Sequence, residues 1–125
     1  VGKSNFIDGR LATLSGADGQ IETASGQRFS GRVSAQVIQG TKVSLSIRPE
    51  QIGLTHRASE AAQPVTVINR IFLGEHTEYV VRHAGLGDLL VLVARQAEAG
   101  EGSFTPGDAG FVSWASETGL ILPED

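Results

Sequence analysis

Apolar and polar residues alternate along much of this chain, and residues 42–48 give the clearest example. Val43, Leu45 and Ile47 fall on one side of that segment, with polar residues between them. Side chains two positions apart share one face of a β-strand, so this pattern predicts a strand with one buried face. Other segments rich in β-branched, aromatic or continuous apolar residues span 65–72, 77–82 and 89–93. Together they favour an all-β protein of about nine or ten short strands.

Glycine-rich turns separate the predicted strands. Of the 125 residues, 16 are Gly, which is about twice the usual share. The turn segments span 16–19, 24–26, 85–88 and 100–107. No segment shows the 3.6-residue apolar period of a helix, and residues 57–62 are the best candidate for a short helical turn. We therefore expect almost no helix.

The chain divides into two similar halves. Residues 55–64 are polar, lack the strand period and end at a Pro, which predicts a connector between lobes 1–54 and 65–122. Residues 40–50 align with residues 107–117 at a constant offset of 67, with matching Gly, Ser and Glu. Two turn-rich units of about sixty residues would be only marginally stable alone. We expect two small barrels or half-barrels that pack together and can exchange strands.

The same pattern predicts which residues form the core. Apolar positions on the inner face of each strand should be buried, whereas the carboxylates at 98–101 and 124–125 should be solvated. Gly110 stands where the aligned segment has Val43, and a Gly inside a strand weakens packing or marks a bulge. The predicted core residues are Val43, Leu45, Ile47, Val67, Ile71, Tyr79, Val81, Leu90, Leu92, Val112 and Trp114.

Composition and charge exclude several classes of function. The chain has no Cys, so it has no disulfide framework, thiolate zinc site or cysteine nucleophile. Its net charge of −4 and scattered basic residues argue against a nucleic-acid or anionic membrane surface. It contains no signal peptide and no apolar run long enough to cross a bilayer. A start at Val1 and the absence of Met are what we expect of a piece of a longer protein.

Motifs that suggest chemistry lack the context that the chemistry needs. Residues 2–4 (Gly-Lys-Ser) resemble the end of a phosphate-binding loop, but a strand-like segment follows them where such a loop requires a helix. His76, Glu78 and His83 could approach each other across a hairpin, but exposed strand positions of this kind are usually solvated. No serine lies in a nucleophile elbow or a triad-like order. The sequence therefore predicts no catalytic, cofactor-binding or metal-ligating residue.

Three segments together resemble a known protein family. They are Gly-Lys-Ser-Asn-Phe-Ile-Asp-Gly-Arg-Leu at 2–11, Val-Ser-Leu-Ser-Ile-Arg-Pro-Glu-Gln-Ile at 43–52, and the run from Phe-Thr-Pro-Gly-Asp to Val-Ser-Trp within 104–114. They are similar to the C-terminal regulatory region of the ATP-binding subunits of bacterial ABC importers. This region is the transport-associated OB-type (TOBE) domain, here of the polyamine, iron(III) and sugar class. The resemblance covers nearly the whole chain, and Ile-Arg-Pro-Glu is its most specific part.

The resemblance implies a role for residues 1–125 as a non-catalytic regulatory domain in solute uptake, with an OB-like fold. An ATPase domain that binds ATP and magnesium would precede Val1 and would be one partner. A second ATPase subunit of a homodimer and the importer's membrane subunits would be the others, with no nucleic acid. The resemblance also implies a cytoplasmic location, peripheral on the inner face of the bacterial inner membrane. The transported solute is not fixed by this chain.

Arg48 and Glu50 are the candidate interface residues. They flank Pro49 at the end of the clearest predicted strand. One interpretation is a strand end, at which Pro49 closes the ladder and the two charges are solvated or form a local ion pair. The other is that both residues hold the regulatory domain against its ATPase domain or against the partner subunit.

Two alternative functions stay open. Lys3, Ser4 and Asn5 form a candidate anion site, because Ser and Asn ahead of a Gly are similar to the start of molybdate-binding members of the same OB-type group. The Ala-Arg pair normally found between that Ser and Asn is missing here. The other alternative is an OB-fold that binds nucleic acid, which the charge and the low aromatic content of 6% disfavour.

Overall fold

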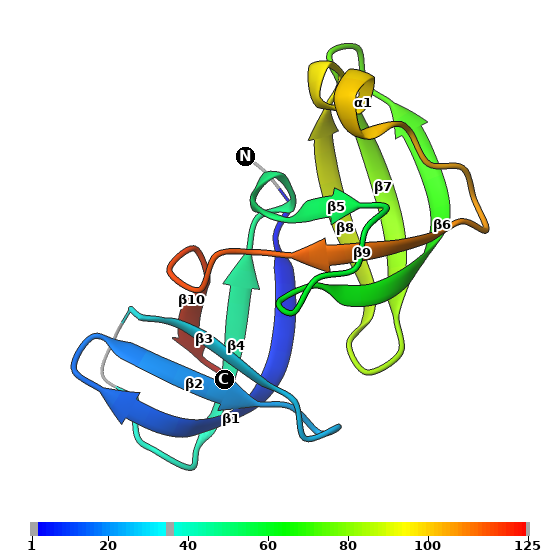
Figure 1. Ribbon diagram of the computed structural model, residues 1–125. Coiled ribbons are helices and arrows are strands. Elements are labelled where there is room, and N and C mark those ends of the chain that lie inside the picture. The colour runs from blue at the N-terminus through cyan, green and yellow to red at the C-terminus, as the bar shows by residue number, and fades with distance from the viewer. Residues whose placement is uncertain (1–2, 35–36, 125) are drawn as a thin grey trace. The chain divides into compact units, whose positions relative to one another are not determined.

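The computed structural model describes residues 3–34 and 37–124 (Figure 1). Gly2, which opens the first segment of the family resemblance, lies outside the described residues. The chain forms two compact units, and each is described by itself. The first unit comprises Val1–Ile47 together with Ala115–Asp125, and the second comprises Arg48–Trp114. The expectation of an all-β fold is confirmed, since strands make up most of the secondary structure of both units.

The first unit is a closed five-stranded barrel with the strand order β1-β2-β3-β10-β4. Neighbouring strands are antiparallel except β10 and β3, which run parallel to each other. Closure removes the unpaired edges that an open sheet would expose. The strands are β1 (Asn5–Ser15), β2 (Asp18–Glu22), β3 (Arg28–Val33), β4 (Lys42–Ile47) and β10 (Leu120–Pro123).

Strand β1 serves two neighbours and bends between them. Its first part pairs with β4 and its second part pairs with β2, with a register shift between Leu11 and Thr13. Gly9 lies where β1 turns from one neighbour to the other. A Cβ atom on Gly9 would lie 2.5 Å from the carbonyl oxygen of Glu22, closer than real Cβ contacts allow. The close approach of the two strands therefore requires Gly at this position.

The interior of this barrel follows the period of two found in the sequence. Val43, Leu45 and Ile47 are all fully buried, as predicted from the alternation in residues 42–48. Leu45 pairs in register with Ile121 of β10 and with Ile7 of β1, so it lies in the middle of the core. The remaining large buried side chains of the barrel are Leu11, Ile21 and Phe29.

The second unit is an open five-stranded antiparallel sheet with the order β5-β9-β6-β7-β8 (Figure 1). It also contains a single turn of 3₁₀-helix, η1, before β5 and a short helix, α1, after β8. The strands are β5 (Gly53–Thr55), β6 (Gln63–Phe72), β7 (His76–His83), β8 (Gly87–Ala94) and β9 (Ala109–Ser113). The helical segments are η1 (Pro49–Gln51) and α1 (Arg95–Glu101).

The two halves of the sequence exchange their last strands. The 67-residue offset places the start of β4 on the start of β9, and it also places Gly53 of β5 on Leu120 of β10. Yet β5 pairs with β9 in the second unit, and β10 pairs with β4 in the first. Each strand thus completes the sheet of the other half, an exchange that the fold prediction allowed. The units consequently do not coincide with the predicted lobes 1–54 and 65–122.

Three predicted core positions on β6 and β8 were placed on the wrong face. Ile71 is 43% exposed because β6 carries a bulge between Val67 and Asn69, which reverses the inward positions beyond it. On β8 the fully buried residues are Leu89 and Val91, whereas Leu90 and Leu92 are half-buried. A continuous apolar run gives no alternation from which the inner face can be read. The other predicted core residues of the second unit, Val67, Tyr79, Val81 and Val112, are buried.

Trp114 and the helix also differ from expectation. Trp114 is only half-buried, because it follows the last residue of β9 and ends the second unit. Residues 57–62 form bends and a turn rather than a helical turn. The helix is instead α1, which buries no residue and therefore shows no apolar period. Its sequence is nevertheless rich in strong helix formers such as Arg, Gln, Ala and Glu.

Leu45→Ala should destabilise the protein by about 2–5 kcal/mol, because the substitution leaves a cavity in the centre of the closed barrel. The free energy of unfolding is measured by urea denaturation. Leu14→Ala is the matched control, since Leu14 is 41% exposed and should change stability by no more than about 0.5 kcal/mol. Equal effects of the two substitutions would contradict this placement of Leu45.

Candidate functional site

The turn at residues 48–51 begins the second unit and carries both candidate interface residues. Pro49 is buried and starts η1, while Arg48 and Glu50 are exposed on either side of it. The backbone N–H of Arg48 donates to Gln51 Oε1 at 2.9 Å, and the Gln51 N–H donates to the Arg48 carbonyl at 2.9 Å. These two hydrogen bonds fix the backbone of the turn. The charged side chains of the turn are therefore presented to solvent from a rigid support.

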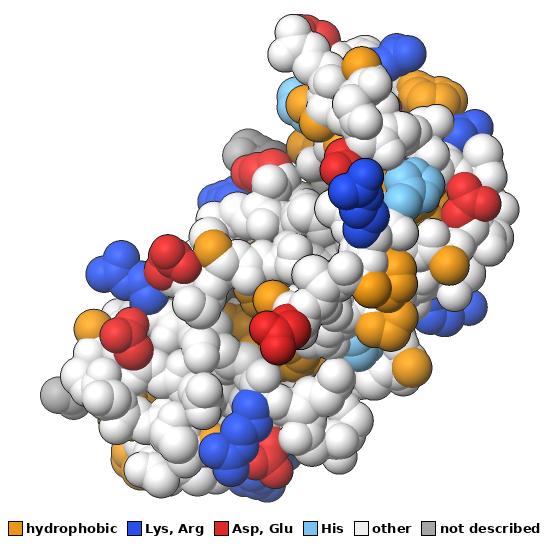
Figure 2. Space-filling view, in the orientation of Figure 1, with side chains coloured by type: hydrophobic (Ala, Val, Ile, Leu, Met, Phe, Trp, Pro, Cys, Tyr) orange, Lys and Arg blue, Asp and Glu red, His pale blue; other side chains and the backbone are white. Residues whose placement is uncertain are grey.

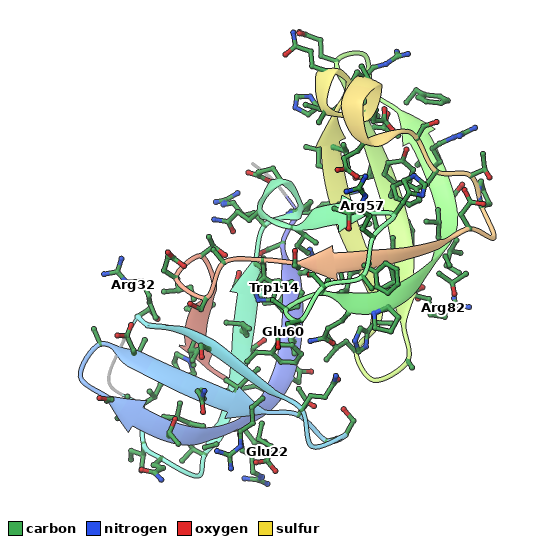
Figure 3. The ribbon with its side chains drawn as sticks, in the orientation of Figure 1. Glu22, Arg32, Arg57, Glu60, Arg82 and Trp114 are labelled. Carbon is green, nitrogen blue, oxygen red and sulfur yellow. The ribbon has the colours of Figure 1, made fainter. Side chains whose placement is uncertain are left out.

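Arg48 and Glu50 do not form the local ion pair that the sequence suggested. Among the described residues the ion pairs are Glu22–Arg28 and Arg82–Asp88. Glu22 and Arg82 are labelled in Figure 3. Both pairs lie on exposed strand positions, where such contacts contribute little to stability. The Arg48 and Glu50 side chains therefore form no ion pair with another residue of the part of the chain described here.

Lys3, Ser4 and Asn5 lead into β1 in three different environments. Lys3 is exposed and Asn5 is buried, while the Ser4 hydroxyl hydrogen-bonds to the Ser46 hydroxyl at 2.7 Å. Asn5 pairs in register with Ile47 of β4. The structure thus shows the first strand of the barrel anchored at its start.

A buried polar network lies beneath α1 in the second unit. Thr77 and Tyr79 are fully buried on the same face of β7. Thr77 Oγ1 donates to Glu98 Oε1 at 2.7 Å, and the Tyr79 hydroxyl donates to Glu98 Oε2. Burial, followed by the hydrogen bond to Glu98, raises the pKa of Tyr79, so the phenol keeps its proton and remains a donor. The expectation that Glu98 is simply solvated is therefore wrong.

Phe104 joins this network to the rest of the second unit. Its backbone N–H donates to the Tyr79 hydroxyl at 3.1 Å, and its carbonyl accepts from Arg70 Nη1 at 2.7 Å. Its ring stacks on His56 with centroids 3.8 Å apart and meets the edge of Tyr79 at 5.7 Å. Gly110 faces the same ring, because a Cβ there would lie 3.1 Å from Phe104 Cε2 and 3.1 Å from Leu54 Cδ1. Gly110 marks this tight packing in β9, whose ladders run without a bulge.

A cavity of about 310 Å³ opens beside this network. It lies between β5 and β8, the two outer strands of the open sheet, with α1 and η1 at its ends. Its apolar wall is formed by Leu54, Leu92, Val93, Ala97 and Phe104. The carboxylates at the cavity are those of Glu50, Glu98 and Glu101.

His83 is buried at the end of β7 and closes the turn to β8. Its Nδ1 accepts hydrogen bonds from the backbone N–H groups of Gly85 and Leu86, at 3.0 and 3.1 Å. Its Nε2 therefore carries the proton and donates to Gln63 Oε1. Burial lowers the pKa of His83. Both ring nitrogens thus have structural partners, and no group of three potential metal ligands occurs among residues 3–34 and 37–124.

Neither sign of charge dominates the visible surface. Figure 2 shows blue and red side chains interspersed over the face in view, with small orange areas between them. Within the described segments, no helix is both long enough and apolar enough to cross a membrane.

Sequence reasoning identified the exposed turn but missed the network around Glu98. Thr77 and Tyr79 carry polar atoms on a buried face of β7, which is a sequence signal that a partner must exist. The identity of that partner could not be read, because Glu98 lies about twenty residues away on a helix that shows no apolar period. The sequence grouped His83 with His76 and Glu78, but it gave no sign of the contact between His83 and Gln63.

Comparison with known sequences identifies the family. The profile of the TOBE domain matches residues 45–122, more than half of the chain. The chain belongs to the TOBE domain family. The match includes the second half of β4, the whole of the second unit and most of β10. The resemblance found from the residues alone is thereby confirmed.

The curated relatives are named as ATP-binding subunits of importers. The TOBE chain is 28% identical over 122 residues to the spermidine/putrescine import ATP-binding protein PotA 1 of Pseudomonas aeruginosa. It is also 28% identical over 127 residues to the spermidine/putrescine import ATP-binding protein PotA of Rubrobacter xylanophilus. Each alignment covers 98% of the chain and 32% of the relative. The chain thus spans about a third of the length of these relatives.

A solved structure shares the fold. The cytoplasmic molybdate-binding protein ModG, in a form with molybdate bound, superposes with a TM-score of 0.80. The superposition covers 96% of each chain at 18% sequence identity. At this identity the likeness supports the paired OB-like architecture, and it says nothing about ligands of the present TOBE domain.

Stability should fall as the pH drops below the ordinary His pKa of 6.5, because folded His83 resists protonation while the unfolded chain accepts the proton. Stability therefore rises with pH between the lowered folded pKa and 6.5, by up to about 1.4 kcal/mol per pH unit for this one proton. Urea unfolding at several pH values measures the slope. His83→Gln should flatten it, whereas His76→Gln, at an exposed histidine, should not.

An unchanged slope in His83→Gln would show that another group causes the pH dependence.

Proposed function

We propose that this chain is the regulatory and interaction domain of the ATP-binding subunit of an ABC importer, and that the importer takes up polyamines. The supporting observation is the alignment of 98% of the chain with importer subunits named for spermidine and putrescine. The TOBE family match is independent of those alignments and agrees with them. The chain itself contributes no catalysis in this proposal.

The remaining machinery would lie outside these residues. An ATPase domain of the same subunit would hold ATP and magnesium, and two such subunits would pair. The subunits would contact the membrane components of the importer from the cytoplasmic side of the bacterial inner membrane. The importance of partners in this proposal agrees with the exposure of Arg48 and Glu50, neither of which forms an ion pair with another described residue.

The transported solute is tested by uptake in cells. Deleting the gene should abolish uptake of radiolabelled spermidine and putrescine, and restoring the intact gene should recover it. Maltose and iron(III) citrate uptake, measured in the same cells, should be unaffected by the deletion. Normal polyamine uptake combined with a loss of sugar or iron uptake would contradict the polyamine assignment while leaving an importer role in place.

Arg48→Ala should reduce solute-stimulated ATP hydrolysis by the assembled importer several-fold without lowering the melting temperature. The physical reason is that Arg48 is exposed on a rigid turn, so its loss would affect a partner contact rather than folding. Arg57→Ala is the matched control, because Arg57 is also an exposed arginine of the second unit. Unaltered hydrolysis, or a lower melting temperature as its sole effect, would show that Arg48 has only a local structural role.

Oxyanion binding at Lys3, Ser4 and Asn5 is the second candidate function. It rests on the motif at the start of β1 and on the molybdate bound by the protein of shared fold. Calorimetry with molybdate, tungstate and sulfate tests it directly. Tight molybdate binding that disappears in Ser4→Ala would favour this function over the regulatory proposal. Binding that survives Ser4→Ala would place the anion elsewhere.

A further inference from the structure

The cavity between β5 and β8 has the size and lining of a small-molecule site. Its volume of about 310 Å³ is at the lower end of the range for ligand pockets. Leu54 of β5, Leu92 of β8 and Phe104 form a largely apolar wall. The two strands come close together without forming a ladder in the described structure, so an opening remains between their edges. This opening gives a small ligand access to an apolar surface within a single unit.

The charged groups that line the cavity are all acidic. Its charged lining residues are Glu50, Glu98 and Glu101, and no described lysine, arginine or histidine lines it. The ion pairs of the described residues lie elsewhere in the chain, so none of these carboxylates is neutralised in that way. A carboxylate in partly apolar surroundings attracts an opposite charge more strongly than one in water. The lining therefore selects for positive charge together with apolar surface.

Glu98 is held in place to act as the main acceptor. Thr77 and Tyr79 each donate one hydrogen bond, one to each of its carboxylate oxygens. A carboxylate has about four lone-pair positions, so about two remain for a ligand. Because buried residues fix its orientation, Glu98 needs little reorganisation to accept a donor, and this lowers the free-energy cost of binding.

We propose that this cavity binds a small organic cation that carries a primary ammonium group on an aliphatic body. The ammonium group donates to Glu98, with Glu50 and Glu101 adding negative charge at the opening. The aliphatic body packs on Leu92 and Phe104. This inference concerns a ligand of the chain itself, and it does not depend on the identity of the importer.

Binding is measured by isothermal titration and by NMR chemical-shift mapping of the 125-residue chain in buffer of physiological ionic strength. The probes are butane-1,4-diamine and butylamine, with butane-1,4-diol as the neutral analogue and succinate as the anionic one. Both amines should bind saturably, shifting the resonances of Leu92, Ala97 and Phe104. The diol and succinate should bind at least about tenfold more weakly, because they lack the positive charge.

Two pairs of variants locate the site. Ala97→Leu adds volume to the wall of the cavity, whereas Ala99→Leu makes the same change at an exposed position of α1 outside the lining. Glu101→Gln removes a charge at the cavity, whereas Glu75→Gln removes one from an exposed turn. The first member of each pair should weaken amine binding, about tenfold for Ala97→Leu and several-fold for Glu101→Gln. The second members should bind as the unaltered chain does.

Glu98→Gln should abolish saturable amine binding if the variant folds. If it does not fold, the two pairs of variants at positions 97 and 99 and at positions 101 and 75 test the proposal. Equal affinity for the diol, or equal effects of Ala97→Leu and Ala99→Leu, would overturn the proposal. Amine binding that shifts resonances over the whole surface without saturation would overturn it as well. Loss of amine binding in these variants would leave the uptake test of the importer role unaffected, so the two proposals can fail separately.

Discussion

Backbone hydrogen bonding at the outer strands of a five-stranded sheet is the constraint on which both units depend. In the first unit β10 bonds to β3 on one side and to β4 on the other, and the sheet closes. In the second unit the corresponding strand β5 bonds only to β9 among the described strands, so β8 retains an outer edge. Related halves thus give one closed barrel and one open sheet, and the difference creates the space beside α1.

Side-chain interactions stabilise the open sheet of the second unit, whereas backbone hydrogen bonds close the barrel of the first. The Phe104 N–H donates to Tyr79 and its carbonyl accepts from Arg70, while its ring stacks on His56. Glu98 ties α1 to β7 through two buried donors. Polar networks of this kind are costly when one member is unsatisfied, so they favour one arrangement of the surrounding elements. A specific geometry at the cavity follows from the need to satisfy these groups.

Period-two alternation made the fold class, the central strand β4 and most core positions predictable. The prediction failed where the local pattern is ambiguous: the bulge in β6 turned Ile71 outward, and the continuous apolar run of β8 concealed its inner face. The 67-residue offset pointed to a repeat, but strand exchange is a long-range pairing that no local pattern encodes. The exposed turn at Arg48 could be predicted from the Ile-Arg-Pro-Glu motif. The role of Glu98 could not, because it depends on contacts with a strand that is distant in the sequence.

The return of β10 to the first barrel has a consequence for the order of events during synthesis. The second unit is complete once Trp114 has been made, but the first barrel lacks β10 until residues 120–123 follow, although its other strands are made before the second unit. Until then β3 and β4 each expose an unpaired edge on the nascent chain, and such edges recruit other strands. The N-terminal half of this domain should therefore be the last to reach its native state and the part most in need of a chaperone.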